Sequence, residues 1–304
     1  MRTINNATWN KGLIVSVMLA VAMPAIPVSS ADAAELTQMG GFGGKKKRGK
    51  MGKRKMMGGQ SGGEVTNPMH PGAPRDLQER TGLIKTGLRP KYPDNAACLE
   101  VKSLFGDQSR YDGSFRPAFA NHGYHGGFDI SADTGTPLVA LADGEVVHKF
   151  VGERLVGNQI FLRHTPEETG LSVYIYSKYK HFDELPDLEI GDKVKMGQFL
   201  GPSGKTGTTG GHYGQAGYPH LHLSIYTSSS PDYRSIERSV LPEDVRQLDP
   251  VAIYLPHAPA NVSSHAARDL PDAEKDVSIP YKTTDGHVEP EGTKLIWPFL
   301  CEAK

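Results

Sequence analysis

Alternating apolar and polar residues in the second half of the chain predict β-strands, most clearly at 220–226. In this stretch, HLHLSIY, leucine or isoleucine occupies every second position. Side chains of a strand point alternately to opposite faces, so these apolar residues would face a core while His220 and His222 share the other face. The pattern therefore predicts two neighbouring imidazoles on a rigid backbone.

Four further apolar runs extend this prediction. They lie at 138–141, 145–151, 158–164 and 171–176. The first two are separated by Asp143 and Gly144 and are predicted to form a hairpin, and a polar turn at 165–170 would join the last two. No convincing 12-residue amphipathic helix interrupts these runs, so we expect an all-β fold with an antiparallel sheet core.

The N-terminal residues have the composition of a secretory signal peptide. Arg2 and Lys11 precede an apolar run at 13–23, and an Ala-x-Ala sequence follows it. This order predicts a signal peptide at 1–33, cut after Ala33, and export to the periplasm or cell envelope. The alternative is an uncleaved membrane anchor, although the run is shorter than the ~20 residues needed to span a bilayer.

The formal net charge of the chain is zero, but the charges are unevenly distributed along it. Ten of the 34 basic residues but two of the 34 acidic residues precede Glu64, so the remainder of the chain is acidic. We expect 34–95 to be a disordered Gly/Lys-rich arm and an extended, proline-containing lead-in with one short helix near 76–81. The arm would contact an anionic surface or serve only as a solvated linker, and export argues against nucleic acid as a partner.

The chain contains two cysteines, Cys98 and Cys301. In an oxidising compartment they favour one bridge between the start of the domain and its C-terminal end. Two separate thiols remain the alternative, because sequence does not fix the distance between them. The tail at 257–304 is polar up to its apolar end, 295–300, which we expect to dock on the domain.

His125 and Asp129 form a second candidate group. The two glycines between them disfavour a helix, so a turn should bring them together at the start of a strand at 128–130. Two imidazoles and a carboxylate with one open position form a ligand set for catalytic zinc. His125, Asp129 and His222 would supply this set and bind one zinc per chain, which would lower the pKa of bound water toward about 7.

His181 and His220 are predicted to face the same site. They could orient the water, accept its proton or stabilise an oxyanion. They could also merely form hydrogen bonds in a wet groove, and spacing does not decide between these roles. His212 lies in a glycine-rich loop, where we expect a solvent-facing side chain rather than a ligand.

Together these motifs resemble those of the lysostaphin/LytM-type zinc metalloendopeptidases that act on bacterial peptidoglycan. The family's His-x-x-x-Asp motif corresponds to His125–Asp129, its Tyr-x-His motif to Tyr179–His181, and its Gly-x-x-Val-x-x-Gly-Gln stretch to Gly191–Gln198. The glycine-rich turn at Gly204–Gly207 and the closing His-Leu-His also match. The resemblance covers about 99–255.

This resemblance implies zinc ligands, catalytic histidines and a β-sheet groove that holds an extended peptide. The implied ligands are His125, Asp129 and His222, and the implied catalytic residues are His181 and His220. The domain at 96–256 is thus expected to be a zinc metalloendopeptidase that hydrolyses bonds in peptidoglycan cross-links or stem peptides.

Other functions remain open. A catalytically silent member of the family would bind wall peptide or activate another wall hydrolase, and the same chemistry would also cleave a glycine-rich protein. Relative to the family pattern, 211–218 is an insertion that would lengthen one wall of the groove. The sequence leaves the cleaved bond and the oligomeric state open.

Overall fold

The structure, a computed structural model, describes residues 66–152, 156–208, 217–256 and 262–304. The signal peptide predicted at 1–33, the basic arm up to residue 65 and His212 lie outside these ranges. No helix in the described ranges is long and apolar enough to span a membrane. The predicted domain boundaries, including 96–256, stay predictions.

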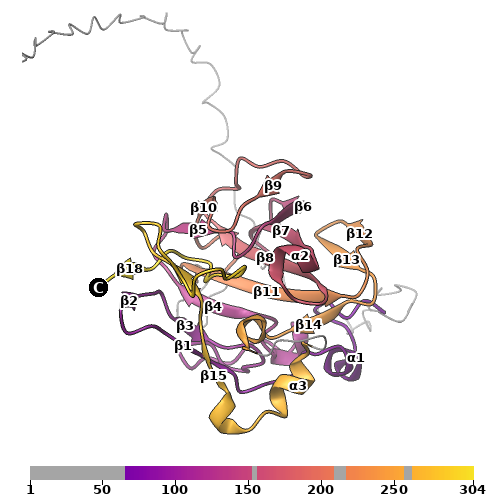
Figure 1. The fold of residues 1–304 in the computed structure, drawn as a ribbon. Helices are drawn as coiled ribbons and strands as arrows, with labels where there is room; N and C mark the ends of the chain where they lie inside the picture. Colours follow the sequence, from indigo (N-terminus) through magenta and orange to yellow (C-terminus); the bar gives the residue numbers. More distant parts are fainter. Residues whose placement is uncertain (1–65, 153–155, 209–216, 257–261) are drawn as a thin grey trace, which may run out of the picture. The chain divides into compact units, whose positions relative to one another are not determined.

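An eight-stranded antiparallel sheet forms the centre of the described fold (Figure 1). Its strands, in spatial order, are β3 (Val101–Ser103), β4 (Phe128–Ser131), β11 (His220–Ser228), β8 (Tyr174–Phe182), β7 (Asn158–His164), β6 (Gly144–Phe150) and β9 (Lys193–Val194), with β14 (Arg246–Leu248) paired to the second half of β11. The predicted all-β class and antiparallel core are confirmed.

The remaining described elements are short, and η denotes a 3-10 helix. They are α1 (Arg75–Arg80), β1 (Arg89–Lys91), β2 (Ala96–Ala97), η1 (Asn121–Gly123), β5 (Pro137–Val139), α2 (Pro166–Thr169), β10 (Phe199–Pro202), β12 (Tyr233–Ile236), β13 (Ser239–Pro242), η3 (Pro250–Tyr254), α3 (Ser264–Arg268), η4 (Asp272–Glu274), β15 (Asp276–Ser278), β16 (Tyr281–Lys282), β17 (Val288–Glu289) and β18 (Glu302–Ala303).

Several predicted elements agree with the structure. β7 has the predicted bounds, β4 contains 128–130, and α1 lies at the helix expected near 76–81. The polar turn at 165–170 contains α2, because Thr165 and Glu168 form a reciprocal capping box and Gly170 ends the helix in a left-handed conformation.

The predicted hairpin between 138–141 and 145–151 is wrong. β5 pairs with β10, whereas β6 pairs with β7 and β9. An apolar run indicates burial but does not specify the partner strand. Here the carboxylate of Asp143 accepts hydrogen bonds from the Met196 amide and the Lys195 ammonium, which ties this connection to the segment before β10 rather than to a two-residue turn.

The two faces of the sheet have different roles. On β11, Leu221, Leu223 and Ile225 are buried in the main core, as the alternation predicts. His220 and His222 lie on the opposite face. Part of that second face is covered by the β12–β13 hairpin, beneath which a smaller apolar cluster forms.

The C-terminal tail packs into the main core. Trp297 is fully buried, its Nε1 donates a hydrogen bond to the Leu99 carbonyl at 2.9 Å, and its ring lies 5.3 Å from that of Phe128. Cys98 and Cys301 form the predicted disulfide. The described tail residues therefore support the back of β4, and none of them lines the groove described below.

We expect Trp297→Ala to lower the free energy of unfolding by about 3–5 kcal/mol, because it removes a large, fully buried ring. Ile190→Ala, at a side chain 60% exposed, should change it by less than about 0.5 kcal/mol. Urea unfolding followed by circular dichroism measures both. Equal midpoints for the two variants would mean that the tail does not contribute to the core.

Candidate metal centre

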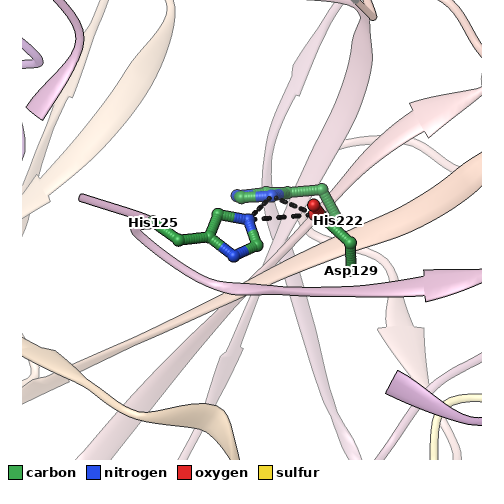
Figure 2. A group of neighbouring side chains, drawn as sticks. All are labelled: His125, Asp129 and His222. Atoms are coloured by element: carbon green, nitrogen blue, oxygen red, sulfur yellow. Dashed lines mark hydrogen bonds and ion pairs between the residues drawn. The ribbon is translucent and has the colours of Figure 1, made fainter. Parts of the chain in front are cut away.

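The structure brings three predicted residues together where β4 pairs with β11 (Figure 2). His222 lies opposite Asp129 in this pairing, and His125 enters from the turn before β4. His125 Nε2 lies 3.0 Å from Asp129 Oδ1 and 3.1 Å from His222 Nδ1, and the last two atoms are 2.8 Å apart. A tetrahedral ion with ligands at 2.0–2.1 Å needs separations of about 3.3 Å, so the site requires little expansion.

The outer hydrogen bonds of the two imidazoles orient their lone pairs inward. His125 Nδ1 is placed to donate to the Leu104 carbonyl at 2.9 Å, and His222 Nε2 to Ser224 Oγ at 3.0 Å. In these neutral tautomers, His125 Nε2 and His222 Nδ1 each present a lone pair to the Asp129 carboxylate. Three acceptors that converge without a proton between them fit a cation.

Gly127 permits this close approach. A Cβ added there would lie 2.3 Å from the Leu223 carbonyl oxygen and 3.0 Å from His222 Nε2. A Cβ at Gly126 would meet side chains alone, Asn121 Nδ2 at 3.1 Å and Gln247 Oε1 at 3.8 Å. The second glycine of the His-Gly-Gly-Phe-Asp sequence is therefore required by the packing of β4 on β11.

Arg116 holds the other oxygen of Asp129. Its Nη2 donates to Asp129 Oδ2 at 3.0 Å and to Ser103 Oγ at 2.8 Å. The guanidinium thereby leaves Oδ1 directed at the two imidazoles. Arg116 was not predicted from the sequence, because it lies in a loop whose position depends on tertiary contacts.

Burial and charge set the protonation states of the site. Burial lowers the pKa of His125, and the nearby Arg116 lowers it further. Burial also lowers the pKa of His222 well below its usual range. For Asp129, burial acts to raise the pKa, but any proton carried by the surrounding histidines, as charge or as a donated hydrogen bond, outweighs it and holds that pKa well below normal. The carboxylate is thus charged and the imidazoles neutral near pH 7, the states in which they bind metals.

The two other predicted histidines face the same site. His220 Nδ1 is placed to donate to the Tyr218 carbonyl at 2.9 Å, which leaves Nε2 3.5 Å from Asp129 Oδ1. His181 Nδ1 is placed to donate to the Thr206 carbonyl at 2.6 Å, and its ring centroid lies 4.7 Å from that of His220. Burial lowers the pKa of both imidazoles, so each presents a lone pair on Nε2.

A β-bulge directs His181 to this face. Asn158 pairs with Phe182 and Gln159 with Lys180, so His181 is the extra residue on β8. Its φ of 70° lies in the left-handed region, which is uncommon for residues other than glycine. In a regular strand His181 and Lys180 would face opposite sides, whereas here both line the groove.

All five predicted site residues line one groove of about 430 Å³. Lys178, Lys180 and Arg238 also line it, as does the loop that carries Arg116. The two lysines were not predicted as groove residues. Their two-residue spacing on β8 puts both on one face of the strand, and the pairing of β8 with β11 identifies that face as the one that carries His222. A second hollow of about 650 Å³ beside β12 and β13 contains none of the five.

Comparisons with known proteins show that part of this chain is similar to a known family. Residues 123–233 match the family model described as Peptidase family M23. Glycyl-glycine endopeptidase ALE-1 of Staphylococcus capitis is 35% identical over 113 residues, which are 37% of this chain and 27% of the relative. Peptidoglycan DD-endopeptidase ShyC of Vibrio cholerae is 37% identical over 101 residues, 33% of this chain and 20% of the relative.

A third relative is named as an activator rather than as an endopeptidase. Murein hydrolase activator NlpD of Salmonella typhimurium is 36% identical over 90 residues, which are 30% of this chain and 22% of the relative. The chain spans about a quarter of the length of these curated relatives. The predicted resemblance to the lysostaphin/LytM-type family is confirmed.

Zinc titration of the metal-free full chain is expected to give one ion per chain and to raise the unfolding temperature, because a ligand of the folded state stabilises it. His222→Ala should lose both effects. His287→Ala removes an exposed tail imidazole and should retain them. Elemental mass spectrometry and calorimetry provide the readouts, and one zinc bound by His222→Ala would contradict this ligand set.

The neighbouring glycines offer a second test. Gly127→Ala should weaken zinc binding and destabilise the fold by about 1–3 kcal/mol, because its Cβ meets backbone. Gly126→Ala should be tolerated better, because the Asn121 side chain can move. Zinc affinity and urea midpoints of the two variants are compared, and equal losses would argue against the packing constraint at Gly127.

Proposed function

We propose that this chain is an exported zinc metalloendopeptidase acting on peptidoglycan, a proposal supported by the match of residues 123–233 to the model of peptidase family M23. The substrate bonds would be peptide bonds in cross-links or stem peptides. One observation carries the proposal: three inward-facing ligand atoms and two further imidazole lone pairs meet in a single groove. This arrangement combines a catalytic zinc ligand set with groups that move protons.

The ligand atoms would be His125 Nε2, Asp129 Oδ1 and His222 Nδ1. When bound there, zinc supplies a Lewis acid that polarises a carbonyl and lowers the pKa of water. Arg116 fixes the carboxylate from behind, and the Leu104 carbonyl and Ser224 hydroxyl fix the two rings. These outer contacts keep the ligands preorganised.

His220 would act as the general base. Its Nε2 faces the ligand cluster, and its Nδ1 hydrogen bond to the Tyr218 carbonyl fixes the tautomer. The lowered pKa keeps this nitrogen free to accept a proton from water near pH 7. The proton taken at Nε2 can then pass to the amine that leaves when the peptide C–N bond breaks.

His181 would assist from the neighbouring position. Its anchored Nδ1 leaves Nε2 as a second acceptor beside His220. In the neutral state this atom can hold a water or the N–H of a peptide, and it stabilises an oxyanion only after it has taken up a proton. The left-handed backbone at His181 is consistent with a functional constraint.

A second candidate is the activation of another wall hydrolase. It is favoured by the likeness to a relative named as a murein hydrolase activator. The presence of all five site residues with inward-facing ligand atoms supports the enzyme instead, because a purely binding role does not require them.

Incubation of the zinc-loaded full chain with purified peptidoglycan should release fragments with new amino termini at one kind of peptide bond. His220→Ala should retain zinc but slow release by about 10²–10⁴-fold, because it removes the general base. His287→Ala is the matched control at an exposed histidine. Mass spectrometry measures the fragments released by the wild type and by each of the two variants.

Chelator should abolish release, and added zinc should restore it. If the wild-type chain binds one zinc but releases nothing, the enzyme proposal is wrong. Stimulation of a wall hydrolase by that inactive chain would then support the activator role.

A further inference from the structure

Cationic side chains occupy the groove floor beside the predicted metal ligands. The pairing of β8 with β11 sets Lys180 opposite His222 and Lys178 opposite Ser224. Alternate residues of a strand share a face, so both lysines point to the side of His222. One two-residue step along the strands, about 6.8 Å, separates the row of Lys180 from the row of Lys178.

Neither lysine forms a close ion pair with a carboxylate of the described residues, although the charge of Asp129 acts on Lys180 and raises its pKa against the larger effect of burial. The ion pairs found in the described ranges include neither Lys178 nor Lys180, and the Lys178 ammonium lies over the Phe161 ring at 5.0 Å. Arg238 also lines this groove; its side chain is 60% exposed, which puts it at the rim, and its Nε lies 3.8 Å from the Glu237 carboxylate. Asp129 is the groove's acidic lining residue in the described ranges, and its second oxygen is already bound by Arg116.

The groove lining has the opposite charge balance to the rest of the chain after residue 63. From Glu64 onward acidic residues outnumber basic ones, yet the described groove lining is basic. A half-buried ammonium without a counter-ion is costly, and its burial lowers the pKa of Lys178 well below the usual range. A carboxylate on a bound molecule would supply the missing counter-ion at both lysines.

Resting on the proposed peptidase function, we propose that Lys178 and Lys180, with Arg238 at the rim, form a subsite for a free carboxylate of the substrate. An extended peptide has nearly the same rise per residue as the strands beneath it. Its carboxylate would therefore lie within about two residues of the cleaved bond. This favours an acidic stem peptide as substrate and disfavours an uncharged oligoglycine bridge.

The subsite is tested with one stem peptide in two forms, prepared with its carboxylates free or converted to amides, and with pentaglycine. The full zinc-loaded chain should cleave the free acid with kcat/KM about 10–100-fold above that of the amide, through KM, because a charge-assisted hydrogen bond is lost in the amide. Pentaglycine should be the poorest of the three.

Substitutions should reduce this ratio selectively. Lys178→Met and Lys180→Met should bring the ratio of free acid to amide toward one, and Lys178→Arg should restore it. Lys102→Met is the control, because this exposed lysine on β3 pairs with Glu100 and lies outside the groove. The assignment to these lysines would be overturned if Lys178→Met and Lys180→Met kept the wild-type ratio of free acid to amide.

Binding separates this inference from the proposed function. Calorimetry with zinc-loaded His220→Ala should show the free acid binding about 10–100-fold more tightly than the amide, whether or not the wild type cleaves either peptide. Equal affinities overturn the carboxylate subsite and leave the peptidase intact. Selective binding without cleavage of any peptide or of peptidoglycan by the wild type keeps the subsite and overturns the peptidase.

Discussion

The pairing of β4 with β11 is the contact on which the site depends. It sets Asp129 directly opposite His222, while Ile130 and Leu221, paired in the next position, face the core. Because side chains alternate, a slip of one residue would bury the polar atoms and expose the apolar ones. The hydrophobic effect on one face therefore fixes the register of the ligand atoms on the other, and Gly127 allows the two backbones to meet closely enough.

The back of this pair is supported by residues far away in the sequence. Trp297 packs on Phe128, the residue before Asp129, and the disulfide ties Cys301 to the segment that leads into β3. Nothing in the described tail reaches the groove, so its contribution is to hold β4 in place from the core side. The geometry of the site and the stability of the C-terminal end are thus linked through one strand.

The parts of the site that the sequence predicted were those fixed by local spacing. Alternation around His220 and His222 places two imidazoles on one face without knowledge of the fold. The features that were not predicted depend on contacts with segments distant in the sequence. The apolar run at 138–141 indicated burial but not pairing with β10, and Arg116 reaches Asp129 from a loop. The bulge at His181 is likewise set by the register against β7, since strict alternation would have separated His181 from Lys180.

The electrostatics of the groove follow from how few negative charges it contains. A site built on two neutral imidazoles and one carboxylate compensates only part of the charge of a divalent ion, and Arg116 shares that carboxylate. Lys180, whose pKa of about 8 leaves it charged near pH 7, adds positive charge on the same face, and Lys178 would add more once an anion lies beside it. With zinc bound, such a site would attract anionic groups, polarise a bound carbonyl and disfavour protonation of the nearby histidines. In the proposed peptidase, the excess of positive charge that assists hydrolysis would also select among peptides, so reactivity and substrate choice would have a common physical origin in this groove.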